Sequence, residues 1–141
     1  MSLIEQSLAI ALRAYAGKTD KAGCEYILHP LRVMSKMKTT GEMAAALLHD
    51  VIEDSDITVE DLLASGIPPE IVAAVECLTK RTGENYEQFI ARVKINRIAA
   101  AVKIADIEDN INVLRLRELN DSDIARVKKY HAAWNALSSG S

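Results

Sequence analysis

A histidine and a cluster of acidic residues stand close together in the first half of this chain. His49 and Asp50 are adjacent, and the acids Glu53, Asp54 and Asp56 follow within the next six positions. The apolar run 44–48 in front of them predicts a buried helix over residues 43–53. Carboxylates near a helix C-terminus face the negative end of the macrodipole. They therefore need a compensating positive charge, for which a bound metal ion is the simplest source.

The spacing inside this helix places the polar groups in pairs. His49 lies four residues before Glu53, and Asp50 lies four residues before Asp54, so each pair shares one face. Imidazole and carboxylate groups are ligands suited to manganese, zinc or iron. The alternative is a buried histidine bonded to a carbonyl beside a solvated acidic helix end. On this segment alone both interpretations stay open.

A second apolar helix carries an acid in a similar setting. Residues 99–105 are mostly small or apolar, and Asp106 follows them directly. A carboxylate among core residues is costly unless it is paired or ligates a metal. Lys103, three residues earlier, is the alternative partner. We interpret His29, which precedes Pro30, as a structural residue at the start of a helix.

Composition narrows the class of protein. The chain has 141 residues, 49% of them hydrophobic and 26% charged, with a net charge of −3. These values are typical of one globular domain and exclude extended nucleic-acid binding. The sequence contains neither an apolar run long enough for a membrane span nor a secretory signal pattern. Cys24 and Cys77 form no CxxC pair, and we expect free thiols in a cytoplasmic protein.

Helical periodicity covers nearly the whole chain and predicts an all-α single domain of about seven or eight helices. Thr58 and Asp61 form an acidic capping box, and Asn120 or Asp121 caps the last helix. Residues 138–141 read as a tail. The expected helices span residues 3–17, 30–36, 43–53, 58–66, 68–80, 85–95, 97–116 and 121–137.

Four segments in order resemble one known family. They are Gly17 with Gly23-x-x-Tyr26-Ile27-x-His29-Pro30-Leu31, then Leu47-Leu48-His49-Asp50-Val51-Ile52-Glu53-Asp54, then Leu78-Thr79-Lys80, then Val102-Lys103-Ile104-Ala105-Asp106-x-x-x-Asn110. Together they resemble the HD-domain phosphohydrolases, and most closely the branch that hydrolyses the alarmones guanosine tetra- and pentaphosphate. The resemblance covers roughly residues 10–115 and implies an HD-type helical bundle.

The resemblance also implies a reaction and a metal site. Enzymes of that branch remove the 3′-pyrophosphate of the alarmone with one divalent ion, commonly manganese. In this chain the corresponding ligands are His49, Asp50 and Asp106. Glu53 and Asp54 fall where the family positions and activates the attacking water. A metal polarises a phosphoryl oxygen and a nearby carboxylate takes a proton, so these roles are physically reasonable.

One metal ligand of the family is replaced in this chain. The first metal histidine precedes a glycine by two residues, and Tyr15 stands there, before Gly17. Neutral tyrosine, with a reference pKa near 10, is a poor substitute for imidazole. A tyrosinate beside a metal is one solution. The simpler expectation is a site with three protein ligands, in which the metal is weakly bound or absent.

The glycine loop departs from the family as well. Lys18 stands where the family usually has glutamine, and Asp20 where the alarmone enzymes commonly have arginine. An acid at that position repels a polyphosphate. Lys18, Lys21 and Lys103 are candidate phosphate contacts, with solvent-facing lysines as the alternative, and Asn110 is a candidate nucleotide contact by family position.

Two functions follow from these observations. The first is a metal-dependent phosphohydrolase acting on a nucleotide or another phosphorylated small molecule, such as guanosine tetraphosphate. The alternative is a non-catalytic HD-fold protein with a degenerate metal site that binds a nucleotide or a protein partner. Tyr15 favours the second, and the retained His49, Asp50, Glu53 and Asp54 favour the first.

Overall fold

The computed structural model describes residues 1–139, and this part of the chain is almost entirely helical. The helices are α1 (Leu3–Ala14), α2 (Leu28–Ser35), α3 (Thr40–Leu48), α4 (Val51–Asp54), α5 (Val59–Ala64), α6 (Pro69–Cys77), α7 (Tyr86–Ile95), α8 (Arg97–Asn110) and α9 (Asp121–Ser138), with a 3₁₀ turn η1 (Val113–Arg115). The all-α prediction is confirmed.

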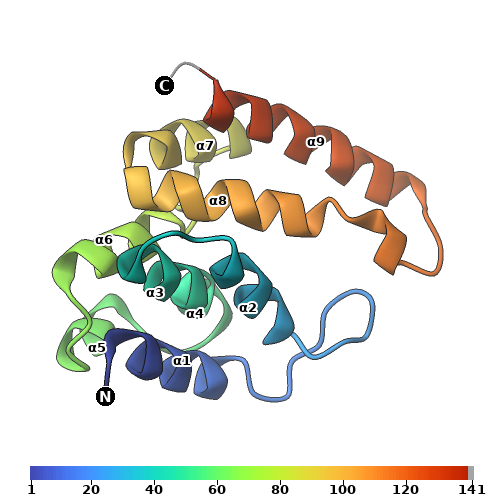
Figure 1. The fold of residues 1–141 in the computed structure, drawn as a ribbon. Helices are drawn as coiled ribbons and strands as arrows, with labels where there is room; N and C mark the ends of the chain where they lie inside the picture. The colour runs from blue at the N-terminus through green and yellow to red at the C-terminus, as the bar shows by residue number, and fades with distance from the viewer. Residues whose placement is uncertain (140–141) are drawn as a thin grey trace.

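Helix α3 lies at the centre of the bundle. It packs against α1, α2, α6 and α8, while α9 lies along α7 and α8 on the other side of the molecule (Figure 1). Every residue from Ala44 to Leu48 is fully buried, because α3 has neighbours on all sides. A helix that is apolar all round is expected only in such a position.

Side-chain caps fix where most helices begin. The predicted box at Thr58 and Asp61 is present, and Asn120 caps α9 with Asp123 as its reciprocal partner. Similar boxes begin α1, α3 and α7. Each box satisfies two backbone N–H groups that would otherwise lack partners. The start of α2 was predicted two residues late, since this helix begins at Leu28 and includes His29 in its first turn.

The helix expected over residues 43–53 is in fact two helices. Helix α3 ends at Leu48, and Asp50 leaves the helical conformation with φ −106° and ψ 6° before α4 begins at Val51. His49 tightens the break because its Nδ1 lies 2.7 Å from the Ala46 carbonyl oxygen. Asp50 therefore stands at a junction between helices. The macrodipole argument, which assumed a continuous helix, overstated the repulsion at this point.

The helix expected over residues 97–116 also ends early, at Asn110. The Arg115 guanidinium donates to the Asp109 carbonyl oxygen at 2.9 Å and brings the following turn back against the end of α8. That contact joins residues six apart, so helical periodicity does not report it. The turn leads to α9, which begins at Asp121 as predicted for residues 121–137.

The remaining expectations concern the chain's surface and end. Cys24 is exposed and Cys77 half-buried, and both are free thiols. No helix within residues 1–139 is both long and apolar enough to span a bilayer. Of the predicted tail 138–141, Ser138 ends α9 and Ser139 caps it, and the last two residues lie outside the described part.

Candidate active site

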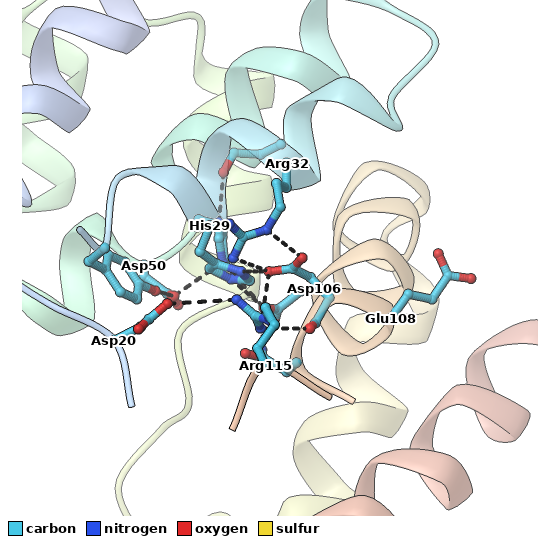
Figure 2. A network of polar contacts seen from close by, with 12 residues as sticks. Asp20, His29, Arg32, Asp50, Asp106, Glu108 and Arg115 are labelled. Carbon is cyan, nitrogen blue, oxygen red and sulfur yellow. Dashed lines mark hydrogen bonds and ion pairs between the residues drawn. The ribbon is translucent and has the colours of Figure 1, made fainter. Parts of the chain in front are cut away.

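One helix junction and helix α8 bring the predicted metal ligands together. His49 and Asp50 stand between α3 and α4, and Asp106 projects from α8. His49 Nε2 lies 3.1 Å from Asp50 Oδ2 and 3.5 Å from Asp106 Oδ1. Helix α2 adds His29 to the same cluster, which Figure 2 shows with its polar contacts.

His49 presents one ring nitrogen to this cluster. Its Nδ1–H donates to the Ala46 carbonyl oxygen, which leaves the lone pair of the neutral ring on Nε2. The side chain is 2% exposed, and Nε2 has no hydrogen-bond partner of acceptable geometry among residues 1–139. Burial lowers the pKa of His49, but Asp50 and Asp106 outweigh it and hold this pKa well above the usual range. The site therefore attracts a positive charge to Nε2.

The Asp106 carboxylate has polar contacts with several other side chains. It accepts hydrogen bonds from Lys103 Nζ at 2.9 Å and from Asn110 Nδ2 at 2.8 Å, and its Oδ1 lies 2.8 Å from His29 Nε2. Burial raises the pKa of Asp106, but Lys103 and the histidines lower it well below its usual value. The carboxylate is ionised, and the ion pair with Lys103 is the partner that the sequence allowed.

His29 has a larger role than the sequence suggested. Its ring is 5% exposed and stands between two carboxylates, with Nδ1 2.6 Å from Asp109 Oδ2 and Nε2 facing Asp106. Arg32 holds Asp109 in turn through two hydrogen bonds of 2.7 and 3.0 Å. Asp109 and Arg32 were not predicted as site residues. The only sequence signal was that Asp109 follows Asp106 by one turn on the same helix.

Two tyrosines contact Asp50 through their hydroxyl groups. The Tyr26 hydroxyl donates to Asp50 Oδ2, and the Tyr15 hydroxyl accepts the Asp50 backbone N–H at 3.1 Å. Tyr15 is 2% exposed, so the position of the missing histidine does face the site. Burial, reinforced by Asp50, raises the pKa of both phenols far above the ordinary value. Tyr15 is therefore a neutral phenol.

The two predicted water-activating acids lie on α4, directly after the junction that holds Asp50. Glu53 and Asp54 are both exposed on α4, and Glu53 Oε1 accepts the backbone N–H of Lys80 at 2.7 Å. Burial raises the pKa of Glu53, the hydrogen bond from the Lys80 N–H lowers it, and the negative charge of Asp50 raises it further. Burial and Asp50 also raise the pKa of Asp54, with Lys18 opposing them.

Two cavities adjoin these groups. One of about 290 Å³ is lined by Tyr26 and Asn110, which both touch the cluster, and by the cations Lys21, Arg115 and Arg126. The other, of about 650 Å³, is lined by Arg13, Lys18 and Asp54 among its residues. The structure thus divides the predicted substrate residues. Lys21 and Asn110 border one cavity, Lys18 borders the other, and Lys103 is held by Asp106.

Asp20, expected to repel a polyphosphate, has partners of its own. Its Oδ1 accepts the backbone N–H groups of Ala22 and Cys24, each at 2.9 Å. Its Oδ2 lies 3.6 Å from Arg115 Nη1, a pair drawn in Figure 2. The acid caps its own loop and is partly balanced by Arg115, so its field in the cavity is weaker than its charge alone suggests.

The donor set fits a divalent metal ion. A buried imidazole nitrogen that has no hydrogen-bond partner within residues 1–139 faces two carboxylates, and both ligand types suit a divalent first-row metal ion. The ring nitrogen opposite it is held by a carbonyl, the arrangement that orients histidine ligands in metal proteins.

Comparisons with known proteins agree with this fold. The chain is 34% identical over 125 residues to guanosine-3′,5′-bis(diphosphate) 3′-pyrophosphohydrolase of Vibrio cholerae, covering 79% of this chain and 18% of that protein. It is 32% identical over 125 residues to the bifunctional (p)ppGpp synthase/hydrolase SpoT of Escherichia coli, with the same coverage. The chain thus spans less than a fifth of these relatives. No family model matches it.

A solved structure supports the same fold. It belongs to a metazoan ortholog of SpoT described as hydrolysing ppGpp, and it superposes with a TM-score of 0.74 over 99% of this chain and 89% of that one. The sequence identity is 20%, so this likeness concerns the fold. The chain is thus similar in sequence to part of the guanosine-3′,5′-bis(diphosphate) 3′-pyrophosphohydrolases and similar in fold to the metazoan ortholog of SpoT.

Proposed function

We propose that this chain is a metal-dependent phosphohydrolase that removes the 3′-pyrophosphate of guanosine tetra- or pentaphosphate or of a closely similar nucleotide. The observation that carries the proposal is the unpartnered Nε2 of buried His49, which faces Asp50 and Asp106. The reaction is inferred from the names of the relatives. The cluster of His49, Asp50 and Asp106 offers the ligands for the metal ion.

His49, Asp50 and Asp106 are the residues proposed to hold the ion, and manganese is its proposed identity. When bound, a divalent ion supplies a Lewis acid for the phosphoryl oxygen and makes water a better nucleophile. Glu53 and Asp54 are proposed to orient this water and accept its proton. Their raised pKa values bring them nearer to neutral pH, which suits a general base.

The cavities on either side support a nucleotide substrate with two phosphorylated ends. Lys21, Arg115 and Arg126 offer cations for phosphate in the 290 Å³ cavity, where Asn110 offers a hydrogen-bonding amide. Lys18 lies beside Asp54 in the second cavity. We propose Lys18, Lys21 and Asn110 as substrate contacts. Lys103 contributes by neutralising Asp106.

A second function is supported by one observation, the neutral buried phenol of Tyr15 at the position of the missing ligand. If this loss abolishes metal binding, the chain is a non-catalytic HD-fold protein that binds a nucleotide or a protein partner. The two functions differ in a measurable property, the affinity for a divalent ion.

The deciding experiment measures metal binding and hydrolysis on the same preparation. Manganese should raise the melting temperature, because a ligand at about 100 times its Kd stabilises the native state by about 2.7 kcal/mol. Guanosine tetraphosphate should then release pyrophosphate. Asp106→Ala should lose both properties, and Asp121→Ala, an exposed acid on α9, should keep both. A wild-type protein with neither property would refute the hydrolase and leave the binding function.

A further inference from the structure

We propose that His29 supplies the metal ligand that Tyr15 no longer provides, so that the ion is held by His29, His49, Asp50 and Asp106. This inference rests on the proposed function, since it concerns the ion of the same site. It changes which residues hold that ion. A histidine from α2 takes over the role of the ligand that the family has at the end of α1, where this chain has Tyr15.

The distances among the polar atoms fit one shared ion. The candidate ligand atoms of His29, His49 and Asp50 all lie within 4.8 Å of one another. Asp106 Oδ1 lies 2.8 Å from His29 Nε2 and 3.5 Å from His49 Nε2. Two ligands at right angles, each about 2.1 Å from an ion, lie about 3 Å apart. The two separations from Asp106 Oδ1 are close to this value.

The orientation of the His29 ring points to the same role. Its Nδ1 faces Asp109 at 2.6 Å, and Arg32 fixes Asp109 through two hydrogen bonds. A carboxylate that accepts Nδ1–H leaves a lone pair on Nε2 and orients it, as in many histidine ligands of metals. In this tautomer the lone-pair nitrogen Nε2 lies 2.8 Å from Asp106 Oδ1, a separation that suits two ligands of one ion.

Tyr15 is unsuited to share the ion. Its hydroxyl already accepts the Asp50 backbone N–H. Its ring instead supports the site, since Tyr15 packs edge-on against Tyr26, and Tyr26 contacts the ring of His29 with centroids 5.6 Å apart. His29 in turn packs edge-on against His49 at 5.1 Å. This row of rings holds the two imidazoles side by side.

The first test counts imidazole ligands in the wild-type protein. Pulsed electron paramagnetic resonance of the manganese-loaded protein detects each coordinated histidine nitrogen. We expect two, from His29 and His49. One nitrogen would overturn the assignment of His29 and leave the proposed function intact. Failure of manganese to bind at all would overturn both proposals, so the two failures are distinguishable.

The second test uses variants. His29→Asn keeps a donor toward Asp109 and should weaken manganese binding by more than about 100-fold, beyond the loss typical of a residue that only orients a ligand. The matched control His131→Asn removes an exposed histidine on α9 and should leave the affinity unchanged. Tyr15→His combined with His29→Asn should regain most of the affinity. Equal affinity in His29→Asn and wild type, with folding verified by circular dichroism, would refute the inference.

Discussion

The Asp106 carboxylate is the buried charge on which the centre of the site depends. In Asp106→Asn the side chain keeps its size but loses its charge and half of its acceptor capacity. The new amide has one oxygen for the two donors that meet here, Lys103 Nζ at 2.9 Å and Asn110 Nδ2 at 2.8 Å. At least one of these contacts becomes a clash of two donors.

The size of the effect follows from the burial of the ion pair. The side chain of Lys103 is 14% exposed and that of Asp106 is 7% exposed, so water replaces the lost partner poorly. Removing one member of a buried ion pair costs about 3–5 kcal/mol. For a chain of this length, that corresponds to a melting temperature about 10–20 °C lower.

The assay is thermal and urea unfolding followed by circular dichroism, at neutral pH with a chelator present. The chelator separates the loss of the ion pair from the loss of bound metal. Asp56→Asn, an exposed acid in the loop after α4, is the matched control and should change little. A shift of less than about 3 °C for Asp106→Asn, equivalent to less than about 1 kcal/mol, would refute the reasoning.

Other substitutions test the supporting structure. Hydrogen bonds from Arg92 and from the Arg81 N–H lower the pKa of the Glu84 carboxyl from 4.5 to about 2, and burial opposes this change. Because this pKa is depressed in the folded state, its stabilisation is present above pH 4.5 and is lost as the pH falls toward 2. Glu84→Gln should therefore melt below wild type at neutral pH, and the difference should vanish near pH 2 in melting curves. Thr39→Ala removes the cap of α3 and should cost about 1 kcal/mol in urea unfolding. Leu48→Ala opens a cavity in the centre of the bundle and should cost about 2–5 kcal/mol by the same measurement. A neutral result at either position would contradict the packing described for α3.

Local patterns in the sequence predicted much of the fold. Capping residues such as Thr58 and Asn120, with helical spacing of apolar residues, placed most helices to within a few residues. They failed where a side chain contacts a backbone carbonyl near the end of a helix. The Arg115 guanidinium on the Asp109 carbonyl stops α8, and the ring of His49 on the Ala46 carbonyl helps to break α3 from α4.

The sequence by itself determined the chemical types at the site. His49 and Asp50 are adjacent, and Asp106 stands on an apolar helix, so each was recognisable from its own surroundings. Tyr15 was recognisable as a departure only because the family supplied a histidine for comparison.

Only the tertiary structure decided which groups face one another. His29 lies 77 positions from Asp106 and 80 from Asp109, yet the packing of α2 on α8 places its ring between these two carboxylates. No local pattern encodes such a contact, because it depends on how two helices cross and not on the spacing within either. The same packing presents the unpartnered Nε2 of His49 to Asp50 and Asp106. The sequence therefore determined which ligand types are present, and the crossing of the helices decided that His29 stands among them.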